Sequence, residues 1–179
     1  WKGMFVPKFA NLIPNSIGSL SNLIHLDLKF ANFGTNIPFH LGNLSSLQHL
    51  DLSWNNFNNP ENLEWLPQLS SLRYLDMSSV NLSKVNNWLQ VMNKLPYLAS
   101  LHLESCNLLS IFSVWLVNSS TSLDILDLSV NNLTLSSLVM EWLFNSNITV
   151  VELDLSDNQF QGLIPFQQNK LSWGSYSQW

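Results

Sequence analysis

Leucines recur along the chain with two superimposed spacings. Within short segments they alternate with polar residues, and between segments the same position returns after 24 to 27 residues. Six segments align without gaps on the pattern LxxLxLxxNxL: LIHLDLKFANF, LQHLDLSWNNF, LRYLDMSSVNL, LASLHLESCNL, LDILDLSVNNL and VVELDLSDNQF. Their leading strand leucines are Leu26, Leu50, Leu75, Leu101, Leu126 and Leu153. A fixed period of this length indicates a stack of structural repeats.

The local alternation predicts a short strand in each repeat, with leucines on one face and polar residues on the other. Because the rest of each repeat must return on the opposite side, consecutive strands are expected to lie parallel, about 4.8 Å apart, in a curved sheet roughly 25 Å long. The return segments have helix-like apolar spacing at residues 62–72, 86–95, 111–117 and 135–144. We therefore predict an α/β solenoid of about six repeats, with a parallel concave sheet and a convex side of 3₁₀ turns and short helices.

The Asn position of the pattern lies where the chain leaves each strand. An inward amide there can bond the backbone of the neighbouring repeat. Asn55, Asn131 and Asn158 fill this position, whereas Ala31, Val80 and Cys106 do not. Side chains are thus expected to make only about half of this ladder. Cys106 is the single cysteine, which excludes an internal disulfide, and we interpret it as a buried structural thiol.

The repeats resemble the leucine-rich repeat family. Ile13-Pro14, Ile37-Pro38 and Gly162-Leu163-Ile164-Pro165 are similar to the plant-type, extracellular subclass. The stretch from about Asn11 to Pro165 is similar to the ectodomains of plant defence receptor-like proteins that detect fungal xylanase. The resemblance implies a leucine-rich solenoid at residues 11–165, a remnant of an N-terminal cap or irregular lead-in at 1–10, and an irregular tail at 166–179.

The same resemblance implies a role in defence signalling. Its parent would be a single-pass protein at the extracellular face of the plasma membrane, with a peptide, protein or saccharide elicitor as ligand and a receptor kinase as co-receptor. This chain opens on Trp1 without a visible signal peptide, so we interpret it as a fragment. An uncapped solenoid would forgo roughly 10 kcal/mol of burial at its ends, and we expect aggregation or end-to-end dimerisation.

Polar and aromatic side chains gather at the N-terminal end of the outward face. The candidate ligand-binding residues are His25, Phe30, His49, Trp54, Arg73 and Tyr74. Aromatic and Arg side chains bury much area for little lost freedom, as at protein-binding hot spots. The alternative is an ordinary solvated concave face.

A second outward column is mostly aspartate, formed by Asp27, Asp51, Asp76, His102, Asp127 and Asp154. Paired carboxylates can serve acid–base chemistry or bind a cation, and the neighbouring His25 and His49 could add metal ligands. We favour neither, because stacked carboxylates repel one another and Asp simply recurs in this repeat type. The expectation is no metal and no cofactor.

Composition limits the function further. Only 11% of the residues are charged, and the net charge is −5 with seven Lys and Arg residues, so a nucleic-acid partner is excluded. We find no GxSxG, HExxH, GxGxxG or P-loop motif and expect no enzyme activity and no catalytic residues. The longest uncharged stretch, 105–122, has a dense apolar part of only about 12 residues, too short to cross a membrane.

Five N-x-[ST] sequons are candidate glycosylation sites: Asn43, Asn81, Asn118, Asn132 and Asn147. Their number is close to chance in a chain so rich in Asn and Ser, but their positions in turns and loops indicate exposure. If the protein is secreted from a eukaryotic cell, we expect sugar on at least Asn118 and Asn147.

Three functional hypotheses remain at this stage. The first is a recognition module of an extracellular receptor. The second is a secreted leucine-rich repeat inhibitor of a microbial polygalacturonase-type enzyme, and the third is a truncated, non-functional receptor fragment.

Overall fold

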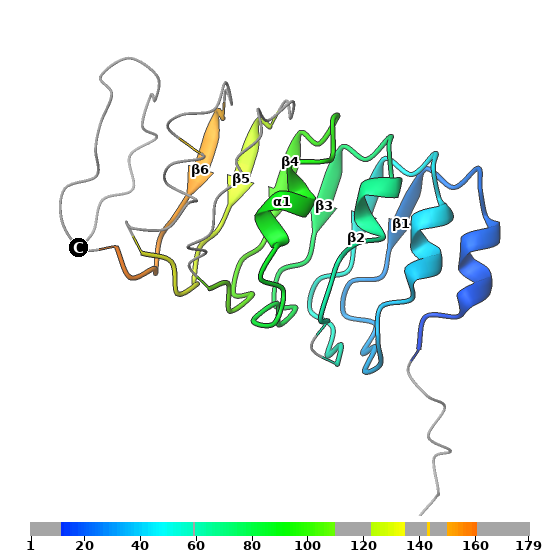
Figure 1. Ribbon diagram of the computed structural model, residues 1–179, viewed down its shortest axis with the longest axis horizontal. Helices are drawn as coiled ribbons and strands as arrows, with labels where there is room; N and C mark the ends of the chain where they lie inside the picture. Colours follow the sequence, from blue (N-terminus) through cyan, green and yellow to red (C-terminus); the bar gives the residue numbers. More distant parts are fainter. Residues whose placement is uncertain (1–11, 59, 110–122, 135–142, 144–149, 161–179) are drawn as a thin grey trace, which may run out of the picture.

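Six short parallel strands form one sheet in strict sequence order (Figure 1). The computed structural model describes residues 12–58, 60–109, 123–134, 143 and 150–160. The strands are β1 (His25–Asp27), β2 (His49–Asp51), β3 (Tyr74–Asp76), β4 (Ser100–His102), β5 (Ile125–Asp127) and β6 (Glu152–Asp154). The predicted parallel stack is confirmed.

The register places each strand leucine directly beside its counterpart. Leu26, Leu50, Leu75, Leu101, Leu126 and Leu153 are successive partners across the sheet. Those of the four middle strands are at most 1% exposed, whereas Leu26 and Leu153 in the outermost described strands are half-buried. The apolar core therefore runs along the inner side of the sheet, and its two outermost described layers are the least buried.

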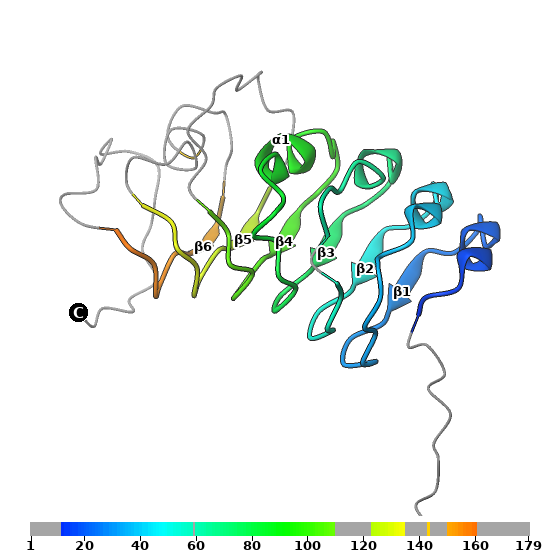
Figure 2. The ribbon, with the colours of Figure 1, turned by 60° about the horizontal axis from the view of Figure 1, so that its bottom comes forward.

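The return segments cover the inner side of the sheet with short helices, as Figure 2 shows. They are the 3₁₀ helices η1 (Asn15–Ser19), η2 (Phe39–Asn43) and η3 (Leu66–Gln68) and the α-helix α1 (Trp88–Met92). Pro14 and Pro38, the prolines of the Ile-Pro elements, come immediately before η1 and η2. The expected convex side is thus present in the described part, while the helix-like segments 111–117 and 135–144 lie outside the described residues apart from Leu143.

Two glycines allow neighbouring return segments to approach closely. A Cβ on Gly18 would clash with the carbonyl oxygen of His40, and one on Gly42 would lie 2.9 Å from the carbonyl oxygen of Trp65. Both contacts are with backbone of the next repeat, which cannot swing aside as a flexible side chain can. Glycine is therefore required here by space rather than by backbone conformation.

Asn131 shows how the repeats are tied together where the strand ends. Its side-chain oxygen accepts hydrogen bonds from the backbone N–H of Cys106 and Leu108, and its amide donates to the carbonyl oxygen of Leu103. Asn55 and Asn158 make the corresponding bonds to Leu28 and Leu128. The predicted asparagine ladder is confirmed at these three positions.

One expectation about this ladder was wrong. Cys106 does take part, because its thiol donates to the carbonyl oxygen of Met77 at 3.1 Å. This carbonyl is the one that an Asn amide would reach from the same position. The thiol is fully buried, and burial raises the pKa of Cys106 well above its usual range. The expectation of a buried structural thiol is thus confirmed, with a hydrogen-bonding role in addition.

Candidate functional site

Three aromatic rings from neighbouring strands stack on the outward face of the sheet. The rings of His25 and His49 are stacked with centroids 3.9 Å apart and planes 12° apart. The rings of His49 and Tyr74 follow at 4.1 Å and 6°. His102, from the adjacent column, approaches Tyr74 at 5.3 Å with a tilt of 40°. We call His25, His49 and Tyr74 the ring stack.

The register of the sheet dictates this arrangement. His25, His49 and Tyr74 are the first residues of β1, β2 and β3 and are direct partners across the sheet. Parallel strands lie about 4.8 Å apart, slightly more than the thickness of an aromatic ring, so flat side chains at matching positions pack face against face. His49 lies between the other two rings and is half-buried, whereas His25 at the end of the stack is exposed.

Burial in the stack shifts the pKa of two of the rings. Partial burial is the main cause that lowers the pKa of His49 below 6.5, and the neighbouring His25 lowers it further. Asp51, Asp27 and Asp76 oppose this shift. Burial, with Asp76 next, raises the pKa of Tyr74 from 10.0 to about 12.

The aspartate column beside the ring stack has a structural task that the sequence did not reveal. One carboxylate oxygen of Asp51 accepts hydrogen bonds from the backbone N–H and the hydroxyl of Ser53, at 2.8 and 2.6 Å. Asp127 and Asp154 hold Ser129 and Ser156 in the same way. The recurring Asp-x-Ser spacing therefore fixes the turn that follows each strand.

Phe30 and Trp54 form a separate aromatic pair beyond the ends of β1 and β2. Their rings are stacked at 5.3 Å, and the two residues are 66% and 45% exposed. Both residues adopt positive φ, at 54° and 56°. The equivalent residues of the later repeats share this left-handed conformation: Ser79, Ser105, Val130 and Asp157. Bulky residues in this region are strained, so the turn geometry is imposed by the surrounding ladder.

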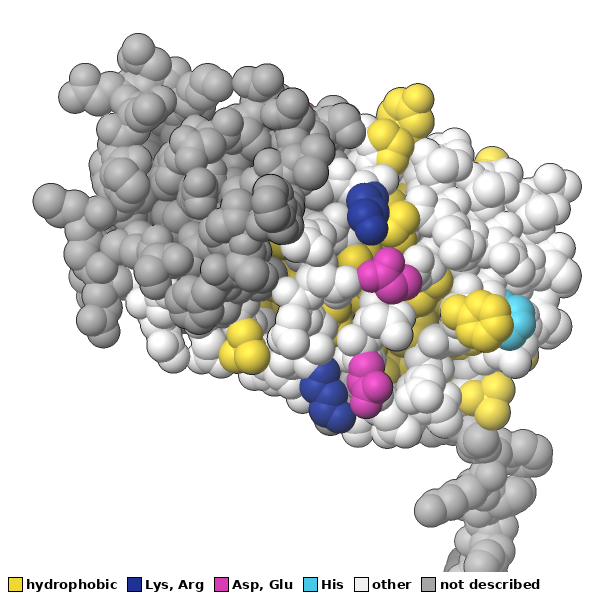
Figure 3. Space-filling view, in the orientation of Figure 1, with side chains coloured by type: hydrophobic (Ala, Val, Ile, Leu, Met, Phe, Trp, Pro, Cys, Tyr) yellow, Lys and Arg dark blue, Asp and Glu magenta, His cyan; other side chains and the backbone are white. Residues whose placement is uncertain are grey.

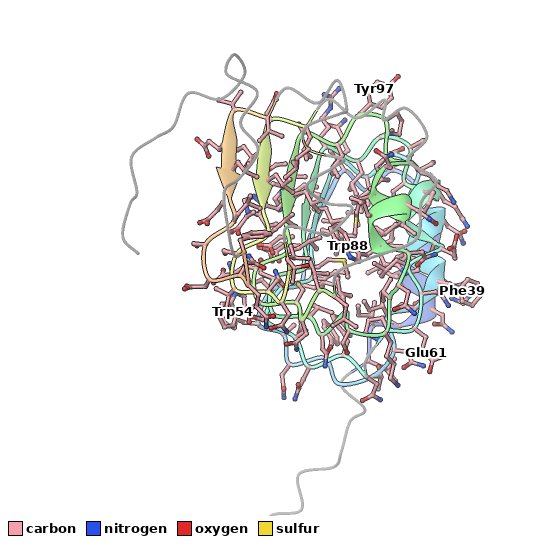
Figure 4. All side chains as sticks on the ribbon, turned by 60° about the vertical axis from the view of Figure 1, so that its left-hand side comes forward. Phe39, Trp54, Glu61, Trp88 and Tyr97 are labelled. Atoms are coloured by element: carbon pink, nitrogen blue, oxygen red, sulfur yellow. The ribbon has the colours of Figure 1, made fainter. Side chains whose placement is uncertain are left out.

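Arg73 lies at the N-terminal ends of the strands, whereas the Phe30–Trp54 pair lies beyond their C-terminal ends. It precedes β3, and its guanidinium is 5.9 Å from the ring centroid of Tyr97, an exposed residue before β4. Figure 4 places Tyr97 and Trp54 at opposite ends of the sheet. The six candidate ligand-binding residues thus divide into the ring stack, the Phe30–Trp54 pair and Arg73. Their role in ligand binding stays a prediction.

Several residues at this surface were missed by the sequence analysis. Tyr97 was not considered, because it lies four residues before the strand leucine Leu101 and so precedes the aligned repeat segment, in which Arg73 is matched by Ala99. Ser100 and His102 share a hydrogen bond of 2.9 Å between Oγ and Nε2. His102 was expected on the outward face as part of the second column, but the pattern could not show that it contacts Ser100.

The sequons that the structure describes differ in accessibility. Asn43 and Asn132 are exposed, whereas Asn81 is half-buried, and its side-chain oxygen accepts a hydrogen bond from the backbone N–H of Ser83. Asn118 and Asn147, where sugar was most expected, lie outside the described residues. Glycosylation at all five stays a prediction.

Within the described ranges, no group of three or more His, Cys, Asp and Glu side chains is placed to hold a metal ion. Nor does any described helix have the length and apolar character needed to cross a membrane.

Comparisons with known proteins agree with the repeat architecture. The family model described as Leucine Rich Repeat matches residues 46–69 and 149–171. Receptor-like protein EIX1 of Solanum lycopersicum is 41% identical over 122 residues, which cover 66% of this chain and 12% of that protein. The chain thus spans about an eighth of the length of this relative.

Two solved structures share the fold. The crystal structure of PEPR1–AtPEP1 matches with a TM-score of 0.62 and 22% identity, over 89% of this chain and 22% of that one. The LRR protein LIC12759 of Leptospira interrogans matches with a TM-score of 0.56 and 24% identity, over 84% of this chain and 41% of that one. From the repeat pattern, the parallel stack and the two matches of the family model, we conclude that the chain is built of leucine-rich repeats, and over 66% of its length it is similar to a plant receptor-like protein.

Proposed function

We propose that the chain is a non-catalytic recognition module whose concave sheet face binds an extended peptide or protein segment. One observation carries this proposal: helices cover one face of the sheet, while the other, concave face presents a row of stacked aromatic rings. The binding site would centre on the ring stack of His25, His49 and Tyr74.

The rigidity of the ring stack supports this role. Side chains that are already held by their neighbours lose little conformational freedom when a ligand binds, so more of the contact energy appears as affinity. Tyrosine and other aromatic residues are enriched at protein-binding hot spots for the same reason. The outward position of Phe30 and Trp54 extends the aromatic surface past the ends of the strands.

Similarity to a tomato receptor-like protein supports the wider setting of this proposal. In a longer parent protein, the module would face the cell exterior, bind an elicitor in defence signalling and act with a receptor kinase. A saccharide elicitor is the alternative to a peptide, and the exposed Phe30–Trp54 pair is the surface that would favour it.

Peptide selection tests the proposal. The full chain is immobilised and a random peptide display library is selected on it, after which the affinity of recovered peptides is measured by fluorescence anisotropy. We expect recovered peptides to lose at least tenfold in affinity when His25, His49 and Tyr74 are all replaced by Ala. Replacing the exposed Phe39 of η2 by Ala, as a control on the helical side, should change affinity less than twofold.

The fold of each variant is checked by circular dichroism. If the triple variant unfolds, the single variant His25→Ala is used instead, since His25 is exposed at one end of the ring stack. Peptides that bind equally well to the chain and to the folded ring-stack variant would overturn the proposal, and so would a failure to recover any binding peptide.

A further inference from the structure

The concave face carries an excess of negative charge that the rest of the chain does not share. Its outward positions hold seven carboxylates: Asp27, Asp51, Asp76, Glu104, Asp127, Glu152 and Asp154. Lys29 is the single Lys or Arg among these outward positions in the described repeats, and its ammonium lies 5.7 Å from the ring centroid of Phe30. These seven carboxylates outnumber the single ammonium by six, whereas the net charge of the whole chain is −5, so the negative charge is concentrated on this face.

The helical face, on the other side of the sheet, carries few charged side chains, and some of them are paired. Figure 3 shows only scattered Lys, Arg, Asp and Glu side chains among neutral ones on the described part of the helical face. Two of the charges away from the concave face form an exposed ion pair, in which Lys84 Nζ lies 3.9 Å from Glu61 Oε1. Charge is thus close to balanced there, and a basic partner would be drawn to the sheet face.

Two of the concave carboxylates are buried and lack a cationic partner. Asp51 and Asp76 are 6% and 7% exposed, and they are neighbours across β2 and β3. In the described part of the chain no Lys or Arg forms an ion pair with either. Like charges opposite each other on a sheet destabilise it, and a buried charge without a counter-charge is costly. A cation that reached this face would relieve both effects.

The geometry also decides what kind of cation fits. The carboxylates are spread over six strands at about 4.8 Å spacing, so they match a series of positive charges along an extended chain better than one compact ion. One oxygen of each Asp in β1, β2 and β3 is held by a backbone N–H two residues ahead, at 2.8 to 2.9 Å. The carboxylates are therefore pre-oriented for a ligand.

We propose that the concave face of this protein is specific for basic peptide segments, whose Lys or Arg side chains pair with Asp27, Asp51 and Asp76 beside the ring stack. This inference rests on the proposed function and adds the chemical class of the ligand. Electrostatic complementarity of this kind raises the association rate and suppresses acidic partners.

The test uses the same peptide library on the full chain. We expect recovered peptides to be enriched at least threefold in Lys and Arg over the unselected library. The variant Asp27→Asn/Asp51→Asn/Asp76→Asn keeps an oxygen acceptor for each turn while removing three charges. It should bind these peptides at least about 20-fold more weakly, at about fivefold per carboxylate with partial non-additivity.

A control matched in charge is Glu61→Gln/Glu64→Gln/Asp124→Asn, which removes three exposed carboxylates outside the concave columns. Its affinity should change less than about twofold, and raising NaCl from about 0.05 to about 0.5 M should weaken binding to the unmodified chain about tenfold. If the first variant fails to fold, Asp27→Asn replaces it with Glu61→Gln as its control, since Asp27 is exposed and lies beside the ring stack; binding should weaken about fivefold.

The outcomes separate the two proposals. Peptides that depend on the ring stack but show no Lys or Arg enrichment would overturn the basic specificity and leave peptide recognition standing. Equal losses in the concave variant and the charge-matched control would also overturn it, because the effect would then reflect net charge. If no recovered peptide depends on the ring stack, both proposals fail.

Discussion

His49 and Tyr74 stack face to face across β2 and β3, with ring centroids 4.1 Å apart and planes 6° from parallel. Cross-strand aromatic pairs contribute roughly 0.5 to 1.5 kcal/mol beyond the area that they bury. Tyr74→Ala should therefore lower the free energy of unfolding by about 2 kcal/mol in urea titrations. Tyr74→Phe keeps the ring and removes only a hydroxyl 3.5 Å from Asp76, so a loss above about 0.7 kcal/mol in this variant would contradict the role of stacking.

The ring stack also predicts how stability depends on pH. Because the pKa of His49 is lowered in the folded chain, the unfolded chain takes up the proton first. Stability should fall as pH drops below 6.5, until the folded pKa is passed. His49→Gln should reduce this acid slope in unfolding titrations. An unchanged slope would show that His49 does not cause it.

The alkaline side has the opposite sign. The pKa of Tyr74 is raised from 10.0 to about 12, so the unfolded chain loses its proton first. Stability should be complete below pH 10 and decrease between pH 10 and 12. The variant Tyr74→Phe should lack this contribution. Unfolding followed at pH 8, 10 and 11 in both proteins checks it, and parallel decreases would contradict the assignment.

Asn131 should be the most sensitive polar position of the ladder. It is 5% exposed and bonds to two backbone N–H groups and one carbonyl of the preceding repeat. Asn131→Ala leaves these buried groups unpaired, at about 3 to 5 kcal/mol in total. Asn158→Ala, at a half-buried position of the same ladder, should cost less than half as much. Equal losses in urea titrations would argue against the burial explanation.

Close packing of the return segments can be tested at Gly42. A Cβ there meets the carbonyl of Trp65, so Gly42→Ala should lower the unfolding temperature clearly, corresponding to about 1 to 3 kcal/mol. Gly34→Ala is the matched control, because the nearest atom to its Cβ is 4.0 Å away. The control should be neutral or slightly stabilising. A neutral Gly42→Ala would show that the neighbouring repeat can move aside.

Much of the fold could be predicted from the leucine spacing alone. A side chain in a strand alternates between two faces, so the position of Leu26, Leu50 and their equivalents was enough to assign both the register and the core. The same alternation placed His25, His49 and Tyr74 together on the outward face. These features depend only on the repeat period, which the sequence states directly.

The details that were missed depend on side-chain direction and local backbone angles. Nothing in the sequence shows that Phe30 and Trp54 adopt positive φ, since bulky residues usually avoid that region. The bond from Cys106 to Met77 depends on a thiol reaching a particular carbonyl. Arg73 was predicted to form one patch with the aromatic residues of the outward face, yet its guanidinium lies 5.9 Å from the ring centroid of Tyr97.

NMR spectra of the histidine imidazoles are the sharpest test of whether a ligand binds the concave face. The four histidines of the chain are natural reporters: His25, His49 and His102 have outward positions on the sheet, while His40 lies in η2 on the helical side. Signals are assigned with single His→Gln variants, and a library-selected basic peptide is then titrated into the full chain. We expect the His25, His49 and His102 signals to shift in parallel with binding, and the His40 signal to stay in place. A titration that shifts His40 and leaves the three sheet histidines unchanged would contradict it.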